Sequence, residues 1–229
     1  MHVWFCQPPL IQDAAKLSAC KAALSAPELA QHDQFCSEKD RHSYLVSHAL
    51  LRYTLSKYAD VPAAQWQFSS GEHGKPELLA SSAAPGLCFN LTHTAGFSAC
   101  VIALNRRCGI DAENIQRKSK LPAVAQRMFA EEERARLKEN NIASRFYYFW
   151  TLREAYVKAL GTGLAGSSKD FYFDVDIKAL SAVMHRKSRS ADAAENWHFN
   201  LYEPTLQHVL AVAVESANAV ELQIREWKP

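Results

Sequence analysis

The sequence has little net charge, no block of like charge and no long apolar run. Among its 229 residues the formal net charge is only +2, and no stretch carries five or more consecutive basic residues. This balance gives no support for binding to nucleic acid. No run approaches the roughly 18 to 20 apolar residues that a membrane-spanning helix needs. Residues 1–10 lack a charged region and contain two prolines, so we expect no signal peptide and a cytoplasmic protein.

Cysteine motifs typical of metal sites are also absent. None of the six cysteines belongs to a Cys-x-x-Cys pair, and the nine histidines include no His-Glu-x-x-His motif. A structural zinc site is therefore not expected. Six cysteines could form disulfides, but a chain of this length without a secretory signal is expected to keep them as free thiols in a reducing cytoplasm.

The composition is that of a globular protein, with 48% hydrophobic and 22% charged residues. A strand is expected at 2–6, and helices follow it. The clearest helix begins at Ser37, where Asp40 completes a Ser-x-x-Asp capping box. Apolar strands come next, among them the run 97–104, so the first part of the chain places helices before strands.

The second part of the chain repeats this order. Helices are expected after Lys120 and β-rich runs after residue 171, while 188–196 is expected to be a polar loop. Helices followed by strands, twice over, predict an α+β fold with an N-terminal half at 1–105 and a C-terminal half at 106–229. Residue similarity between the halves is too weak to establish a repeat from the sequence.

A helix motif, WTLREAYVKALGTGL, occupies residues 150–164. Trp150, Glu154 and Lys158 follow one another at helical spacing and share one face, opposite the apolar face. One interpretation is a surface ion pair on a helix that ends at glycine. The alternative is a binding surface, because an exposed tryptophan beside a charged pair is typical of such surfaces.

A second motif, CGIDAENI, begins at Cys108. In a strand, Asp111 and Glu113 would lie on one side, and Ile110 and Ala112 on the core side. Two adjacent carboxylates repel each other unless a cation lies between them, and oxygen ligands suit magnesium. The alternative is the end of a strand that faces solvent.

Two further stretches contain groups that can bind phosphate. In FNLTHTAGFSACVIAL (89–104), Thr92, His93 and Thr94 are expected in the turn of a hairpin, where they could donate hydrogen bonds to phosphate. Threonine and glycine are also ordinary turn residues. In the GKP stretch, Lys75 follows a glycine that permits close approach of the backbone.

In this order, GKP, FNLTHT, GIDAE and WTLREAYVKALGTGL resemble the motifs of the surfactin-type 4'-phosphopantetheinyl transferases. The match spans residues 74–164, and the helix around 40–52 also looks similar. The resemblance implies two similar α+β subdomains packed as an intramolecular pseudo-dimer, with coenzyme A bound between them. It also implies a monomer.

The resemblance further implies the reaction. Enzymes of this family transfer 4'-phosphopantetheine from coenzyme A to a serine of an apo acyl or peptidyl carrier protein and release 3',5'-ADP, with magnesium as cofactor. The sequence does not identify the carrier, which could serve fatty-acid, polyketide or nonribosomal-peptide synthesis. No nucleic-acid or membrane partner is expected.

By the same resemblance, Asp111, Glu113 and Glu154 would hold magnesium. Glu154, directly or through a water molecule, would take the proton of the serine, and Lys158 would neutralise phosphate oxygens. The residues expected to contact coenzyme A are Lys75, Thr92, His93, Lys158 and Arg41. Arg41 and His93 are assigned to its 3'-phosphate, because the basic residues that the family often carries before this helix are missing here. Arg52 is a weaker candidate that could be structural.

Two other functions remain open at this stage. An inactive module that binds coenzyme A or a carrier protein would have no need of Asp111, Glu113, Glu154 and Lys158 together. A magnesium-dependent phosphohydrolase would keep these carboxylates, but would give no reason for the GKP and THT stretches that precede them.

Overall fold

The computed structural model describes residues 1–71, 74–79, 84–117, 121–139, 142–163, 169–187, 196–218 and 220–229. Residues 188–195 of the expected polar loop lie outside the described residues, as does Leu164 at the end of the helix motif.

The N-terminal half has one strand, three α-helices and four more strands in its described residues. They are β1 (His2–Cys6), α1 (Ala14–Ala23), α2 (Ala26–Gln34), α3 (Glu38–Leu55), β2 (Phe68–Ser70), β3 (Pro76–Leu78), β4 (Leu87–Thr94) and β5 (Phe97–Leu104). Short 3-10 helices at Pro8–Leu10 and Ala63–Gln65 connect some of these elements.

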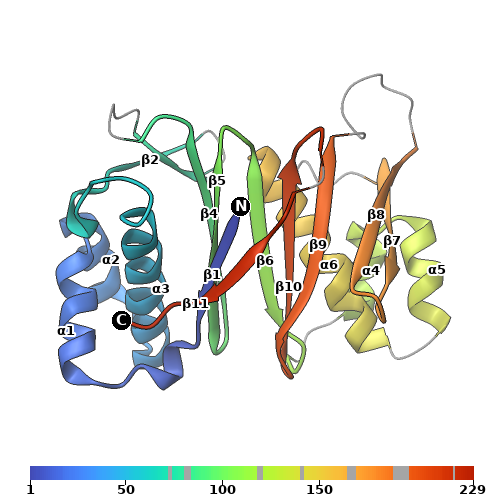
Figure 1. The fold of residues 1–229 in the computed structure, drawn as a ribbon. Helices are drawn as coiled ribbons and strands as arrows, with labels where there is room; N and C mark the ends of the chain where they lie inside the picture. Colours follow the sequence, from blue (N-terminus) through green and yellow to red (C-terminus); the bar gives the residue numbers. More distant parts are fainter. Residues whose placement is uncertain are drawn as a thin grey trace.

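The C-terminal half repeats the order strand, three helices, four strands and ends in one further strand. Its elements are β6 (Cys108–Asn114), α4 (Leu121–Met128), α5 (Glu131–Glu139), α6 (Ile142–Leu160), β7 (Phe171–Asp176), β8 (Ser181–Arg186), β9 (Trp197–Thr205), β10 (His208–Glu215) and β11 (Gln223–Glu226). In Figure 1 the helices α1–α3 lie at the left and α4–α6 at the right and rear, with the sheets between them. The predicted α+β fold with two similar halves is confirmed.

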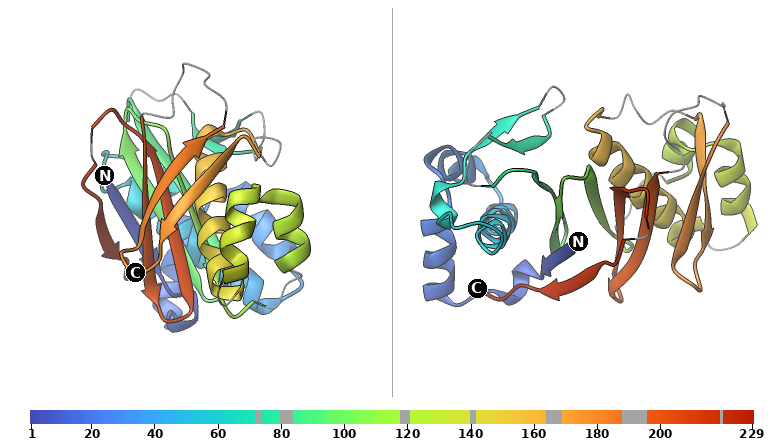
Figure 2. Two further views of the ribbon diagram at one scale, coloured as in Figure 1. Left: turned by 90° about the vertical axis from the view of Figure 1, so that its right-hand side faces the viewer. Right: turned by 45° about the horizontal axis from the view of Figure 1, so that its top comes forward.

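The strands form a four-stranded sheet, a five-stranded sheet and a small hairpin. Their orders are β11-β1-β5-β4, β6-β10-β9-β8-β7 and β2-β3. The core order β1-β5-β4 thus has its counterpart in β6-β10-β9. Strand β11 runs parallel to β1, and Trp227, just after it, is buried in the N-terminal core. The end of the chain therefore crosses back to the first sheet, as both views of Figure 2 show. The boundary between residues 105 and 106 stays a prediction.

Local sequence explains the elements that matter for the site. The Ser37 hydroxyl accepts a hydrogen bond from the Asp40 N–H at 3.3 Å, as the capping box predicts. The apolar stripe of α3 is buried at Leu45, Ala49 and Leu55. Alternation along β6 places Ile110 and Ala112 in a core formed with β1, β5 and β10, so Asp111 and Glu113 lie on the opposite side of the strand.

The expected position of the β4–β5 turn is wrong. Strand β4 continues through Thr92, His93 and Thr94, and the turn consists of Ala95 and Gly96 alone. Gly96 has a φ of +87°, which only glycine adopts readily, while the β-branched threonines suit an extended strand. As a result, Thr92 and Thr94 share one side of the strand and His93 lies on the other.

The structure also bears on the cysteines and on membranes. All six cysteines are free thiols, and Cys6, Cys20, Cys100 and Cys108 are buried. None of the helices in the described parts of the chain is both long enough and apolar enough to span a bilayer.

Candidate active site

A cavity of about 980 Å³ opens between α3 and the neighbouring strands β4 and β6. This volume lies at the upper end of the range of roughly 300 to 1,000 Å³ that is usual for ligand sites. Five predicted site residues line it: Thr92, His93, Asp111, Glu113 and Lys158. Arg41, Lys75 and Glu154 are outside the described lining of this cavity.

Gly109 sets the distance between β6 and α6. A Cβ atom at this position would lie 2.1 Å from the backbone oxygen of Ala155 and 2.5 Å from the nitrogen of Ala159. Only glycine therefore allows the strand to lie directly on the helix backbone. This close packing brings the acidic side of β6 to the face of α6 that carries Glu154 and Lys158.

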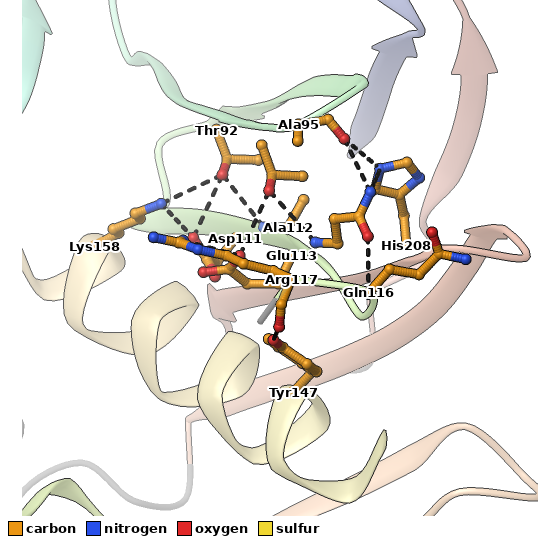
Figure 3. A network of polar contacts seen from close by, with 12 residues as sticks. Thr92, Ala95, Asp111, Ala112, Glu113, Gln116, Arg117, Tyr147, Lys158 and His208 are labelled. Carbon is orange, nitrogen blue, oxygen red and sulfur yellow. Dashed lines mark hydrogen bonds and ion pairs between the residues drawn. The ribbon is translucent and has the colours of Figure 1, made fainter. Parts of the chain in front are cut away.

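Lys158 and Asp111 form the central contact of the site, which Figure 3 shows. The Lys158 Nζ lies 2.5 Å from Asp111 Oδ1, and the side chains are 31% and 8% exposed, respectively. The other oxygen, Asp111 Oδ2, is buried and has no hydrogen-bond partner among the described residues. An unpartnered carboxylate oxygen is costly to bury, so this atom is suited to a cation.

The three predicted carboxylates influence one another's pKa. Burial, together with the charges of Asp111 and Glu113, raises the pKa of Glu154 to about 7, against the opposing effect of Lys158. Burial and the charge of Asp111 raise the pKa of Glu113. Burial also raises the pKa of Asp111, against the opposing effect of Lys158. The charges of Asp111, Glu113 and Glu154 therefore act on one another, and these three residues are called the acidic cluster below.

This cluster is not a closed metal cage. In the part of the chain that the structure describes, no three His, Cys, Asp or Glu side chains are close enough to hold an ion together. The chemistry nevertheless fits a hard divalent cation, because the donors are carboxylate oxygens that repel one another. Lys158 occupies Oδ1 of Asp111, so a cation and the lysine would use different oxygens.

Lys75 lies away from the cavity. Its Nζ donates to the backbone oxygens of Cys108 at 3.3 Å and Ala159 at 3.4 Å, which ties the loop before β3 to β6 and to the end of α6. A lysine at a helix C-terminus is favourable, because the carbonyl groups there carry partial negative charge. The role of Lys75 at coenzyme A stays a prediction.

The region before α3 is organised by Glu28. Its carboxylate contacts Arg52 at 2.7 Å and His48 at 3.0 Å, and the Arg52 side chain is 1% exposed. Arg52 therefore has a structural role, which the sequence left open beside its weaker candidacy for the 3'-phosphate. Arg41 lies in the first turn of α3, but Lys39 and His42 are the neighbouring basic side chains that line the cavity. The contact of Arg41 with a 3'-phosphate stays a prediction.

Two residues outside the predicted set contact the acidic cluster. The Trp150 side chain forms a hydrogen bond that lowers the pKa of Glu113, and its ring stacks on Phe146 at 5.9 Å. Arg117 lies 3.7 Å from Glu113. The shared helix face of Trp150, Glu154 and Lys158 was the signal for the tryptophan. Arg117 could not be predicted in the same way. It follows Glu113 by four residues, a spacing that brings side chains together on a helix, but this segment is not helical.

Family models match both parts of the chain. A model described as the 4'-phosphopantetheinyl transferase superfamily matches residues 107–213. Another, described as the N-terminal part of 4'-phosphopantetheinyl transferases, matches residues 12–105. The first contains Asp111, Glu113, Glu154 and Lys158, and the second contains Thr92 and His93.

Curated relatives agree with these matches. The chain is 33% identical over 217 residues to the 4'-phosphopantetheinyl transferase HetI of Nostoc sp. strain PCC 7120, covering 93% of this chain and 87% of the relative. It is 27% identical to the transferase gsp of Aneurinibacillus migulanus, over 76% of this chain and 68% of the relative. The 4'-phosphopantetheinyl transferase Sfp of Bacillus subtilis strain 168 is 27% identical over 58% of each chain. With its two halves, its acidic cluster and these relatives, the chain belongs to the 4'-phosphopantetheinyl transferase family.

Proposed function

We propose that this transferase moves 4'-phosphopantetheine from coenzyme A to a serine of an apo acyl or peptidyl carrier protein, with magnesium as cofactor. The observation that carries the proposal is the coupled set of Asp111, Glu113, Glu154 and Lys158 beside a cavity large enough for a nucleotide. Such a set supplies the three requirements of this chemistry: a cation site, a positive charge and a base.

Glu154 is the proposed base. Without a bound cation its pKa is raised to about 7, close to neutral pH, where a general base works best. A cation held beside it would lower this pKa and keep the carboxylate ionised. The serine Oγ attacks the phosphorus of the phosphopantetheine phosphate, and its proton passes to Glu154. The bond from this phosphorus to the oxygen of the adenosine 5'-phosphate breaks, and the electron pair leaves with 3',5'-ADP.

Lys158 is the proposed partner of the phosphate oxygens. It lies in the lining of the cavity and is only partly exposed, so its charge acts where little water screens it. His93, on the other side of β4 from Thr92, lines the same cavity and can donate to phosphate. The proposed contacts with coenzyme A therefore come from both halves of the chain.

Asp111, Glu113 and Glu154 are the proposed holders of the divalent cation. When bound there, the cation would supply charge neutralisation for the pyrophosphate and its leaving oxygen. The unpartnered Oδ2 of Asp111 and the mutual repulsion of the carboxylates support this assignment.

Intact-mass spectrometry of apo carrier proteins tests the function. A small panel of apo acyl and peptidyl carriers is incubated with the enzyme, coenzyme A and Mg²⁺. One phosphopantetheine adduct should appear on at least one carrier, and a chelator should abolish it. A carrier whose serine is replaced by alanine is the control. No adduct on any carrier, or an adduct unaffected by the chelator, would contradict the proposal.

A further inference from the structure

Side chains of β4 join the two sheets of the molecule. Three alternate residues of β4 each accept a hydrogen bond from an N–H group of β6. The pairs are Asn90 Oδ1 with Ile110 at 2.9 Å, Thr92 Oγ1 with Ala112 at 3.2 Å and Thr94 Oγ1 with Asn114 at 3.4 Å. Side chains thus take the place of backbone partners along this edge of β6, and they fix β6 against β4.

The turn after β4 is held from the same side. Ala95 O accepts from Asn114 Nδ2 at 3.1 Å and from His208 Nε2 at 2.9 Å, as Figure 3 shows. His208 is buried and its Nδ1 contacts Thr205 at 2.7 Å, so its ring has a defined orientation. The end of β4 is therefore fixed from the C-terminal half.

Each threonine hydroxyl has one proton, and in both cases it is available to a carboxylate. Thr92 Oγ1 accepts from Ala112 and from the Lys158 Nζ at 3.4 Å, which leaves its proton for Asp111 Oδ1 at 3.4 Å. Thr94 Oγ1 accepts from Asn114 and donates to Glu113 Oε2 at 3.5 Å. In this arrangement neither hydroxyl has a proton left for a phosphate.

The two donors on Asp111 use the same oxygen. Thr92 and Lys158 both contact Oδ1, while the buried Oδ2 has no hydrogen-bond partner within the described parts of the chain. A carboxylate held through one oxygen presents the other in a fixed direction. Residues that form hydrogen bonds to metal ligands orient those ligands and raise the affinity of the site for the metal.

We propose that Thr92 and Thr94 are positioning residues, which orient Asp111 and Glu113 for a divalent cation across the joint between the halves. They act through these carboxylates. This inference rests on the proposed function, because it assigns a task to residues around the same site.

Binding of Mn²⁺ to the enzyme alone tests the inference. Mn²⁺ serves as the probe because it takes the same oxygen ligands as Mg²⁺ and its free-ion signal is measurable by electron paramagnetic resonance. Thr92→Val and Thr94→Val keep the shape of the side chain and remove the hydroxyl. Each should weaken Mn²⁺ binding by about 10-fold to 100-fold. Thr94→Ser, which keeps the hydroxyl, should bind nearly as the wild type does.

Asn90→Ala is the matched control. Asn90 also joins β4 to β6, but its side chain contacts the Ile110 N–H and not a carboxylate. It should lower the melting temperature and leave Mn²⁺ affinity within about threefold of the wild type, well short of the loss expected for a lost partner of a metal ligand. Should Thr94→Val fail to fold, Thr94→Ala and Thr94→Ser give the same comparison.

The inference is overturned if both valine variants bind Mn²⁺ as tightly as the wild type. It is also overturned if Asn90→Ala loses as much affinity as they do, since the hydroxyls would then act only by holding the sheets together. Failure of the proposed function looks different: the wild type would then give no adduct on any carrier. An active wild type with unaffected threonine variants rejects the inference alone.

Discussion

Each half of the molecule holds a buried arginine–glutamate pair at the corresponding place in its helices. In the N-terminal half Arg52, on α3, lies 2.7 Å from Glu28 in α2. In the C-terminal half Arg153, on α6, lies 2.7 Å from Glu133 in α5. Both arginine side chains are 1% exposed. Each long helix is therefore fastened to the helix before it by the same kind of contact.

The surroundings of the two pairs agree in detail. Each glutamate accepts the N–H of the residue three positions earlier, at the start of its helix, at 2.8 Å for Glu28 and 3.0 Å for Glu133. Each arginine also donates to a backbone oxygen at 2.8 Å, that of Ala63 or of Phe171. These pairs show at the level of residues that the halves are built alike.

The difference between the halves begins one residue further on. Arg52 is followed by Tyr53, whose hydroxyl donates to Ala19 O and whose ring stacks on Trp227. Arg153 is followed by Glu154. Strand β1, HVWFC, has no carboxylate, whereas β6, CGIDAEN, has two. The arginine–glutamate pair is thus a structural feature of both halves, whereas the acidic cluster is found only in the C-terminal half.

Removing the carboxylate of either pair should produce the largest loss of stability. Glu133→Gln removes the carboxylate that lies 2.7 Å from the buried Arg153 guanidinium and should lower the free energy of unfolding by about 3 to 5 kcal/mol. Glu28→Gln should cost less, because Glu28 is 13% exposed against 0% for Glu133. Urea unfolding at pH 7 measures both. Losses below about 1 kcal/mol in both variants would show that the pairs do not brace the helices.

The N-terminal pair should make stability depend on acid. Burial alone would raise the pKa of Glu28, but bonds from His48, Arg52 and Ser25 outweigh it and lower the pKa from 4.5 to about 2. A carboxylate whose pKa is lowered by folding stabilises the fold at pH values above its unfolded pKa. For Glu28 this contribution disappears as the pH falls from about 4.5 to about 2.

The wild type should lose up to about 3 kcal/mol over this range that Glu28→Gln does not lose. Urea unfolding at pH 5 and pH 3 measures about half of this difference. Parallel acid profiles of the two proteins would contradict this prediction.

Adding a methyl group between β6 and α6 should have a smaller effect. Gly109→Ala would place a Cβ against the backbone of Ala155 and Ala159, and overpacking of this kind costs about 1 to 3 kcal/mol. Because the strand must move, carrier modification should also slow. An alanine variant with unchanged stability and unchanged rate would show that β6 and α6 are not held at contact distance.

A further prediction separates stability from activity at Glu154. Its pKa is raised to about 7, so its ionised form is disfavoured in the folded state. Stability from this group is present below the unfolded pKa of 4.5 and is lost as pH rises through about 7. Glu154→Gln should therefore be more stable than the wild type at pH 8, with the difference gone near pH 4. Thermal melts at these two pH values, without metal, detect the change; a less stable variant at pH 8 would contradict it.

Much of this arrangement could be predicted from local sequence. The capping box placed the start of α3, and alternation in β6 placed Asp111 and Glu113 on one side and Ile110 and Ala112 in the core. Such signals are carried by neighbours in the chain, so they need no knowledge of the rest of the fold.

The parts that were missed depend on contacts between distant segments. Thr92 and Thr94 were expected in a turn, but they lie in β4, where their partners are residues of β6. The pairing of β11 with β1 joins the two ends of the chain, and nothing in either strand specifies its partner. The contacts of Glu28 with His48 and Arg52 could not be predicted, because they form only when α2 and α3 pack against each other.

The most direct measurement of the central claim compares the residues that follow the two arginines. Rates of carrier modification are measured by intact mass for Glu154→Gln and Tyr53→Phe under identical conditions with Mg²⁺. Glu154→Gln should be slower than the wild type by about 10² to 10⁴, the usual contribution of one positioned base. The rate for Tyr53→Phe should stay within about threefold of the wild-type rate, since Tyr53 only packs within the N-terminal half and takes no part in proton transfer. Near-normal turnover of Glu154→Gln, or an equal loss in both variants, would contradict the assignment of the chemistry to the C-terminal half.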